Sequence, residues 1–402
     1  MKKVALVLSG GGSRGGYQIG VWEALRELDI KPDMVFGTSV GAINSAMIAQ
    51  GNLELSKNLW LQMETDMIFD IDDAKEEIPE NVKEKISDLN IAGMPAENAI
   101  AYAKEIVLSG GAGNTGLLGL LNKYVDEKKV RASGLIYGLV ATAFPGFSGR
   151  FLSLNDIPQG CLVNYIIASA SCFPAVQKCT IDGTTYIDGG YSDNMPVSMA
   201  LNNGATDIIA VNLEAAGFIR KDTIKRAEKE AHDFRIIKSP HDLGNFLLFD
   251  KKNTERIMRL GYLDAMRAFG KYDGSVFTFE KGCFSSHGLM GADMAANILE
   301  LDPTRIYNRK TLLAALDDSI ASYRGSSRYG IYALNTSLKI KEIVTQISHD
   351  LSDGELRISI LCYIADSLKK DQANSIFLKP SLFKLLEHDV QAANFLLQNG
   401  LL

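Results

Sequence analysis

The start of the chain alternates between short, wholly apolar runs and longer segments whose apolar residues recur at helical spacing. Val4–Leu8 is uninterruptedly apolar, which is typical of a strand buried on both faces of a parallel sheet. The next segment has a helical period, Met34–Phe36 predicts a second strand, and Val40–Gln50 predicts a buried helix that ends at Gly51. This order predicts an α/β fold with a mostly parallel central sheet flanked by helices.

Residues 52–134 interrupt this rhythm. They are predicted to be helical, with a glycine-rich break at 109–114, and so to form a helical insertion over the sheet and a candidate lid. The apolar runs Ile100–Leu108 and Leu117–Leu121 fit either core helices or the wall of an apolar channel.

Strand patterns resume after the insertion. Cys179–Ile181 and Thr184–Ile187 flank Asp182-Gly183, a strong signal for a β-hairpin. From about residue 215 the chain is predicted to be mainly helical, and residues 283–402 carry no catalytic signature. We therefore predict an α/β domain that is followed by a helical C-terminal extension over 283–402. The remaining predicted strands are Leu135–Ala143, Phe151–Leu154, Ile208–Asn212 and Ser275–Phe279.

Composition narrows the class of protein. The chain has 402 residues, of which 46% are hydrophobic and 22% charged, so a disordered or collagen-like chain is excluded. Its net charge of −6 argues against nucleic-acid binding. Residues 215–282 hold 14 basic and 10 acidic residues, a local net charge of 14 − 10 = +4. This segment fits either a solvated helix face or a surface that meets anionic lipid.

The cysteines and the N-terminal run bear on location. Five cysteines with no metal-ligand spacing fit a reducing compartment and predict no metal site. The apolar run Val4–Leu8 is shorter than a secretory signal requires, and no run is long enough to span a membrane. We expect a cytoplasmic protein without a cofactor.

A glycine-rich loop, Ser9–Gly16, follows the first strand. Gly10, Gly12 and Gly15 match the spacing of a dinucleotide-binding loop, but strand two does not end in the acidic residue that binds ribose. Backbone amides in such a loop can equally hold the oxyanion of an acyl-transfer intermediate. The sequence favours this second interpretation.

Two further motifs supply a nucleophile and a base. The stretch Gly37-Thr38-Ser39-Val40-Gly41 lies between a predicted strand and helix, as a nucleophile elbow requires. Asp188 ends the second hairpin strand, directly before Gly189 and Gly190, and is a candidate general base.

These motifs together resemble the patatin-like phospholipase family, and bacterial members in particular. The glycine loop Gly10–Gly15, the elbow Gly37–Gly41 and Asp188–Gly190 occur in the family's order. Family-like sequence also occurs at Ala170–Val176, Asp193–Val197, Ser239–Phe249 and Gly261–Ala265. The resemblance therefore covers about residues 1–282 and implies that this range is a patatin-like catalytic domain.

The resemblance implies a Ser39–Asp188 dyad that hydrolyses acyl lipids without a metal. Gly10, Gly11 and Gly12 would form the oxyanion hole, and Arg14 would shape the loop, meet a phosphate headgroup or form a surface salt bridge. Gly15, Gly37, Gly41, Gly189 and Gly190 would support the site.

Alternatives remain open at this point. A Ser–Asp–His triad could use His232, His241 or His287, which all follow Asp188. The same elbow could serve a serine acyltransferase, or the chain could be a catalytically silent lipid-binding protein. The expected substrate is a phospholipid, lysophospholipid or related acyl ester, with peripheral contact at the inner membrane surface and no nucleic-acid partner. The sequence does not predict the oligomeric state.

Overall fold

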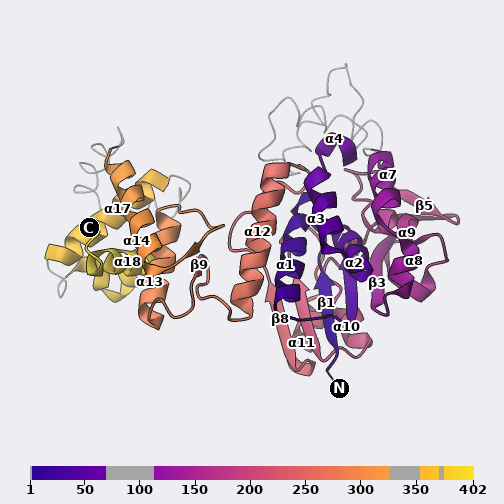
Figure 1. Cartoon of the computed structure of the whole chain (residues 1–402), viewed down its shortest axis with the longest axis horizontal. Helices are drawn as coiled ribbons and strands as arrows, with labels where there is room; N and C mark the ends of the chain where they lie inside the picture. The colour runs from indigo at the N-terminus through magenta and orange to yellow at the C-terminus, as the bar shows by residue number, and fades with distance from the viewer. Residues whose placement is uncertain (1, 69–112, 326–353, 371–374) are drawn as a thin grey trace, which may run out of the picture. The chain divides into compact units, whose positions relative to one another are not determined.

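A computed structural model describes residues 2–68, 113–325, 354–370 and 375–402 (Figure 1). The chain divides into two compact units, Met1–Ala268 and Phe269–Leu402. The predicted helical run Ile100–Leu108 and most of the glycine-rich break at 109–114 lie outside the described residues.

A mixed sheet organises the first unit. Its strands run in the order β5-β6-β3-β2-β1-β7-β8, and β4 also pairs with β3. The neighbours from β3 to β8 are parallel, whereas β4 and β6 run antiparallel to β3. This arrangement confirms the predicted fold class. The strands are β1 (Val4–Leu8), β2 (Met34–Thr38), β3 (Ile136–Phe144), β4 (Ser148–Ser153), β5 (Cys179–Ile181), β6 (Thr184–Asp188), β7 (Asp207–Val211) and β8 (Asp233–Ile237).

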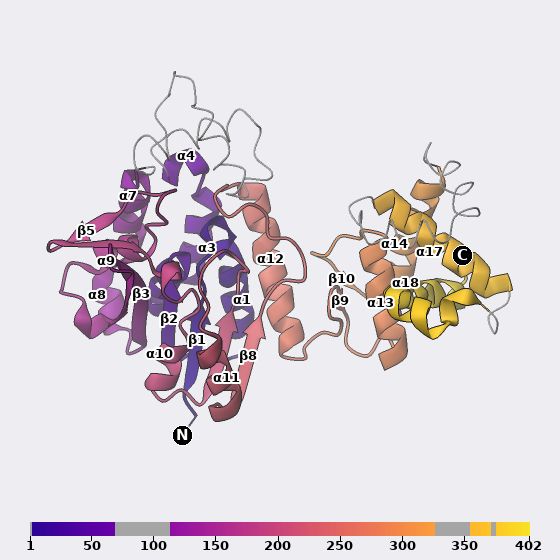
Figure 2. The same cartoon turned by 180° about the vertical axis from the view of Figure 1, so that it is seen from behind.

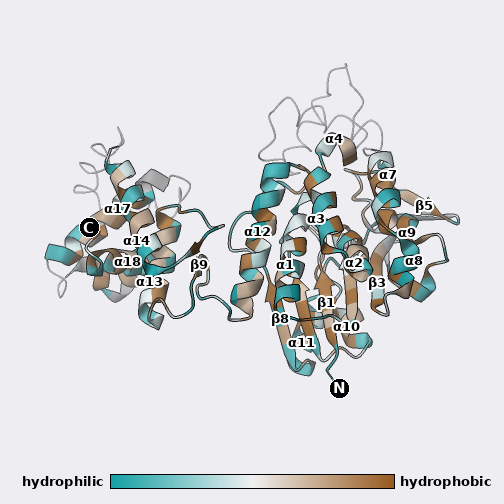
Figure 3. Ribbon diagram, in the orientation of Figure 1, coloured by the Kyte–Doolittle hydropathy of each residue, from teal (hydrophilic) through white to brown (hydrophobic). Residues whose placement is uncertain are grey.

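The most apolar strand lies inside the sheet. Every residue of β1 is buried, because β2 and β7 pair with its two edges and helices cover both faces. Alternate side chains of β1 and β2, among them Val7 and Phe36, pack with helices α10 and α11. On the neighbouring strand β3, the Tyr137 side chain points to the opposite face of the sheet. Its hydroxyl donates to the Ala42 carbonyl of α2, so α2 covers that face. Figure 3 shows these central strands in brown, the colour of apolar residues.

Helices therefore form a layer on each side of the sheet (Figures 1 and 2). One layer contains α1 (Gly16–Glu27), α2 (Val40–Gln50), α3 (Leu53–Gln62) and α12 (Lys251–Ala268). The other contains α10 (Val197–Asn202) and α11 (Lys221–Glu230). The described residues of the range 52–134 contain α3, α4 (Thr65–Ile68), α7 (Thr115–Tyr124) and α8 (Glu127–Ala132). The unit also contains α9 (Leu162–Ser169) and the short turns η1 (Gly12–Gly15), η2 (Leu154–Asp156) and η3 (Gly189–Tyr191).

Strand β8 differs from the sequence-based prediction, which made this part of the chain helical. Its residues alternate between polar and apolar only briefly, and Ile236 remains 40% exposed because the strand lies at the edge of the sheet. An edge strand with one free side lacks the continuous apolar run that identified β1.

The second unit has its own hydrophobic core, built from helices. Only Thr278–Phe279 of the predicted strand Ser275–Phe279 is extended, as β9, and it pairs in parallel with β10 (Ile306–Tyr307). The helices are α13 (Ser286–Ile298), α14 (Arg309–Arg324), α17 (Gly354–Lys370) and α18 (Pro380–Gln398), with the short turn η4 (Ile376–Leu378). None of the helices in the described ranges is both long and apolar enough to cross a membrane.

Two glycines let α1 and α12 approach closely in the first unit. A Cβ atom on Gly20 would lie 1.8 Å from the Met258 carbonyl oxygen, and one on Gly261 would lie 2.0 Å from the Tyr17 carbonyl oxygen. Both contacts are with backbone, which cannot move aside as a flexible side chain can. The two helices can therefore pack at this distance only without side chains at these positions.

We expect Gly20→Ala to lower the free energy of unfolding of the first unit by about 2–3 kcal/mol, because it overpacks this contact. Gly119→Ala is the matched control, since Gly119 lies inside α7 and a Cβ added there would meet no atom within 4 Å. That change should add about 0.5–1 kcal/mol through helix propensity. Denaturant unfolding measures both, and equal effects of the two changes would contradict the packing argument.

Candidate functional site

Strand pairing along β3 brings the ends of two other strands together. β4 occupies one edge of β3 from Gly138 to Ala143, so both β2 and β6 must pair with the other edge. On that edge β2 ends opposite Val140, and β6 ends opposite the next residue, Ala141. The last residues of these strands are Thr38 and Asp188, so the residue that follows β2, Ser39, comes next to Asp188.

Ser39 occupies a strained turn between β2 and α2. Its φ of 56° and ψ of −126° are unfavourable for a residue with a side chain. The turn is held because the Ser39 amide donates to Ser169 Oγ at 2.9 Å and the Ser169 hydroxyl donates to the Val140 carbonyl at 2.6 Å. This geometry is that of a nucleophile elbow, which exposes the serine hydroxyl at the end of a strand.

The two glycines of the elbow are required by close backbone contacts. A Cβ on Gly37 would lie 2.1 Å from the Gly41 carbonyl oxygen, and one on Gly41 would lie 2.3 Å from the Leu8 carbonyl oxygen. A side chain at Gly37 would clash inside the turn, and one at Gly41 would push the turn away from β1. Their predicted supporting role therefore has a steric basis.

Asp188 is buried and its carboxylate has a fixed orientation. Its Oδ1 accepts a hydrogen bond from the Gly190 amide at 2.7 Å, and its own amide donates to the Ser171 carbonyl at 2.8 Å. Burial raises the pKa of Asp188 to about 6, while hydrogen bonds from the Ser39 side chain and the Gly190 amide oppose the rise. A carboxylate with such a pKa is a suitable general base near neutral pH.

The glycine loop lies against the same site and is pinned at both ends. The Gly10 amide donates to the Asn194 carbonyl at 3.1 Å, and the Ser13 amide donates to the Phe246 carbonyl at 2.8 Å. The Gly11 and Gly12 amides have no hydrogen-bond partner among the described residues. Of the three amides predicted to hold an oxyanion, that of Gly10 is therefore already engaged, whereas those of Gly11 and Gly12 are available.

Arg14 holds the loop to two other segments. Its Nε donates to the Gly244 carbonyl at 2.8 Å, and its Nη1 donates to the carbonyls of Leu213 and Glu214 at 3.2 and 3.1 Å. No carboxylate pairs with it in the described part of the chain. Of the roles considered for Arg14, these contacts match the shaping of the loop.

The other predicted supporting glycines pack where a side chain would not fit. A Cβ on Gly15 would lie 2.4 Å from the Trp60 ring, and one on Gly189 would lie 2.1 Å from the Val140 carbonyl oxygen. Gly190 contributes its amide to Asp188. These residues surround Ser39 and Asp188 without offering a reactive group.

Asn194 is a site residue that sequence reasoning missed. The residues Asp193–Pro196 are typical of a helix start, but α10 begins only at Val197. Asn194 is 2% exposed, its carbonyl accepts from Gly10, and it lines the pocket beside Ser39. The contact between Asn194 and Gly10 joins positions 184 residues apart, so no local sequence pattern predicts it.

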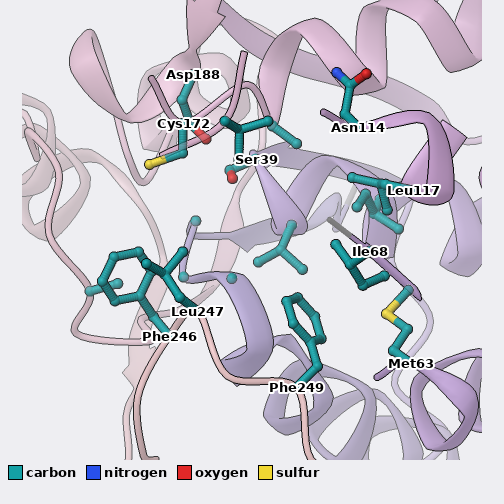
Figure 4. A pocket seen from close by; sticks show the side chains of 18 of the residues that line it. Ser39, Met63, Ile68, Asn114, Leu117, Cys172, Asp188, Phe246, Leu247 and Phe249 are labelled. Carbon is teal, nitrogen blue, oxygen red and sulfur yellow. The ribbon is translucent and has the colours of Figure 1, made fainter. Parts of the chain in front are cut away.

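A mainly apolar pocket adjoins Ser39 and Asp188 (Figure 4). Figure 4 shows the two side chains next to each other at one end, with Met63, Ile68 and Phe249 toward the other. The pocket contains about 790 Å³ of empty space including its mouth, and Leu117 of the predicted insertion contributes to it. No histidine is among its described lining residues, and the described part of the chain holds no metal-binding cluster of His, Cys, Asp or Glu.

Cys172 is the other nucleophilic side chain in the pocket. Burial, with a smaller contribution from the nearby negative charge of Asp188, raises the pKa of its thiol to about 12. The thiol therefore stays protonated at neutral pH and is a poor nucleophile. Cys172 therefore does not compete with Ser39 as a nucleophile.

Asp188→Asn should stabilise the protein while leaving its shape unchanged. The folded state raises the pKa of Asp188 from 3.8 to about 6, so folding favours the protonated form and loses stability as pH rises through about 6. Removing the charge should add up to about 3 kcal/mol at pH well above 6, and less in mildly acidic buffer. Thermal unfolding at the two pH values measures the difference, and a gain that is independent of pH would contradict the burial argument.

Curated relatives match about half of the chain. The rat patatin-like phospholipase domain-containing protein 7 is 26% identical over 222 residues, which cover 52% of this chain and 13% of that protein. The human patatin-like phospholipase domain-containing protein 6 is 28% identical over 218 residues, with the same two shares. Lysophospholipase NTE1 of Mycosarcoma maydis is 25% identical over 215 residues, or 52% of this chain and 10% of that protein. The chain thus matches a small part of each relative, and its predicted bacterial membership stays a prediction.

Solved structures show weaker similarity. VipD from Legionella pneumophila is 16% identical with a TM-score of 0.41, over 100% of this chain and 85% of that one. The type III effector ExoU is 14% identical with a TM-score of 0.32, over 99% of this chain and 74% of that one.

The family comparison covers the segment that contains the site. Residues 6–201 match the family model described as patatin-like phospholipase, and this range includes the glycine loop, Ser39, Asp188 and Asn194. This part of the chain therefore matches the patatin-like phospholipase family.

Proposed function

We propose that the chain is a serine lipid acyl hydrolase in which Ser39 is the nucleophile and Asp188 the general base. The observation that carries the proposal is the meeting of β2 and β6 on one edge of β3. A strained serine there lies beside a buried carboxylate of raised pKa and near two backbone amides that have no hydrogen-bond partner among the described residues.

The proposed reaction proceeds in two steps. Ser39 Oγ attacks the ester carbonyl carbon while Asp188 accepts the hydroxyl proton, and the amides of Gly11 and Gly12 hold the oxyanion of the tetrahedral intermediate. Asp188 returns the proton to the leaving alcohol, which leaves the acyl group on Ser39. Water, activated by Asp188 in the same way, then releases the fatty acid and restores the serine.

The pocket supports an acyl chain as the bound group. Its lining beyond Ser39 consists mainly of aliphatic, methionine and aromatic side chains, including Trp60 stacked on Phe249 with ring centroids 6.3 Å apart. An apolar chain gains free energy by leaving water for such a surface, whereas a sugar or peptide would lose hydrogen bonds there. A phospholipid, lysophospholipid or related acyl ester is the substrate class that fits.

A dyad explains the site better than a triad. The His232 side chain is 84% exposed, and its Nδ1 lies 3.6 Å from Asp207 Oδ1 at the start of β7. Neither His241 nor His287 is among the described residues that line the pocket. Within the described residues Asp188 is the titratable side chain that reaches Ser39.

We expect Ser39→Ala to abolish fatty-acid release from a mixed lipid panel, because it removes the only proposed nucleophile. The panel should include phospholipids, lysophospholipids and neutral acyl lipids, with a chelator present and an added thiol or alcohol acceptor in a parallel reaction. Acyl transfer to the acceptor without release of free acid would show an acyltransferase instead.

The matched control combines His232→Gln, His241→Gln and His287→Gln in one chain, which should retain most activity. A loss as deep as that of Ser39→Ala, in a variant that still folds, would overturn the dyad.

The pH dependence of the hydrolysis rate should follow the ionisation of the proposed base, Asp188. The initial rate on a soluble ester should rise with pH and level off above about 6, because Asp188 must be ionised to accept the proton. Burial also raises the pKa of the neighbouring Asp193, to about 7, so Asp193→Asn is the control and should leave the inflection near 6 in place. An inflection that disappears with Asp193→Asn would show that Asp188 is not the titrating base.

A further inference from the structure

An exposed aromatic cluster lies beside the candidate site and takes no part in the proposed chemistry. Phe144 packs edge-on against Phe147 with ring centroids 5.6 Å apart, and against Phe173 at 6.2 Å. Phe147 also packs against Tyr191 at 6.1 Å. We call these four residues the aromatic patch. Its outer members, Phe147 and Tyr191, are 56% and 44% exposed, an unusual exposure for rings that form one contiguous group.

The aromatic patch carries positive charge. The Lys178 ammonium lies 4.7 Å from the ring centroid of Phe144 and 4.8 Å from that of Phe173. The segments that supply the patch, residues 144–151, 173–179 and 189–192, contain Arg150 and Lys178 and no acidic residue. On a chain of net charge −6, this is a local surface suited to anionic partners.

The patch is continuous with the wall of the pocket. Phe173 follows Cys172, which lines the pocket, and the Tyr191 hydroxyl donates to the Phe173 carbonyl. In the sheet, Asp188 pairs with Ala141 and Thr185 pairs with Phe144, so β3 continues three residues past the level of Asp188 before it reaches the patch. The patch therefore lies beyond Asp188 along the direction of β3.

We propose that the aromatic patch, with Lys178, is the surface through which this chain docks on a phospholipid bilayer that carries anionic headgroups. Exposed Phe and Tyr rings partition into the interfacial layer of a membrane, and a lysine beside them meets lipid phosphates. Docking there would bring the pocket next to the lipids. The inference rests on the proposed function, because it is the acyl-lipid substrate that makes a bilayer the relevant partner.

The basic segment 215–282 is a weaker candidate for this role. Arg226 pairs with Glu230 in α11, Arg235 with Asp233 and Lys238 with Glu214. These three cations pair with nearby carboxylates, and no cluster of exposed aromatic rings accompanies them among the described residues. Of the two interpretations that the sequence left open for this segment, the three ion pairs fit a solvated face.

Vesicle cosedimentation tests the proposal, with all variants made in a Ser39→Ala background so that no lipid is consumed. The probes are phosphatidylcholine vesicles with and without about one third phosphatidylserine. Phe147→Ser should weaken binding about tenfold on both, because one exposed ring no longer inserts. Lys178→Gln should weaken binding about fivefold on the anionic vesicles alone.

Ile236→Ser is the matched control. Ile236 is 40% exposed and lies on β8, at the opposite edge of the sheet from β5 and β6. The Ile236→Ser variant should bind both kinds of vesicle as tightly as the Ser39→Ala parent does. Equal binding by Phe147→Ser and the parent would overturn the proposal, and so would equal losses from Phe147→Ser and Ile236→Ser. A change of oligomeric state on Phe147→Ser with vesicle binding intact would overturn it in favour of a second copy as the occupant.

Activity of the chain with Ser39 present separates the two proposals. Phe147→Ser should keep the rate on a short-chain soluble ester and lose at least fivefold on vesicles, which supports both. Binding that depends on Phe147 in a chain that hydrolyses neither substrate would support docking and overturn the proposed function. Hydrolysis of vesicles at the parent's rate by Phe147→Ser would overturn docking and leave the hydrolase in place.

Discussion

The site depends on a limit in the hydrogen bonding of one strand. Each residue of β3 can pair with one neighbour on each edge, and β4 already occupies one edge from Gly138 to Ala143. β2 and β6 must share the other edge, and they do so end to end. This is why residues 149 positions apart in the chain, Ser39 and Asp188, become neighbours, since 188 − 39 = 149. Any change that shifted β6 by a residue along β3 would turn Asp188 to the other face of the sheet.

The remaining features of the site stabilise this junction or exploit it. Ser169 ties the strained Ser39 turn back to β3, and the Asn194 carbonyl ties the glycine loop to the segment that follows Asp188. Arg14 fixes the same loop to three carbonyls on later parts of the chain. The turn that carries Ser39 and the glycine loop are thus held by several hydrogen bonds to other parts of the chain, so that little conformational freedom is lost when substrate binds.

The sequence was most informative where local pattern alone determines structure. Val4–Leu8 and Val40–Gln50 match β1 and α2 residue for residue, because a continuous apolar run and a glycine stop are local signals. Ser39 and Asp188 could be named from their glycine-flanked motifs. The engaged Gly10 amide, the position of Asn194 and the edge strand β8 could not, because each depends on a partner far away in the chain. The aromatic patch likewise comes from three separate segments that are unremarkable when read one at a time.

The position of β1 has a consequence for synthesis. One edge of this apolar strand pairs with β7, which begins at Asp207 and so leaves the ribosome roughly two hundred residues later. At about 5–20 residues per second, roughly ten to forty seconds pass before that partner emerges. Throughout this interval β1 has an unpaired edge and unburied side chains, which is the state most prone to aggregate. Yield in a heterologous host should therefore depend more on chaperone supply during translation than on the stability of the finished fold.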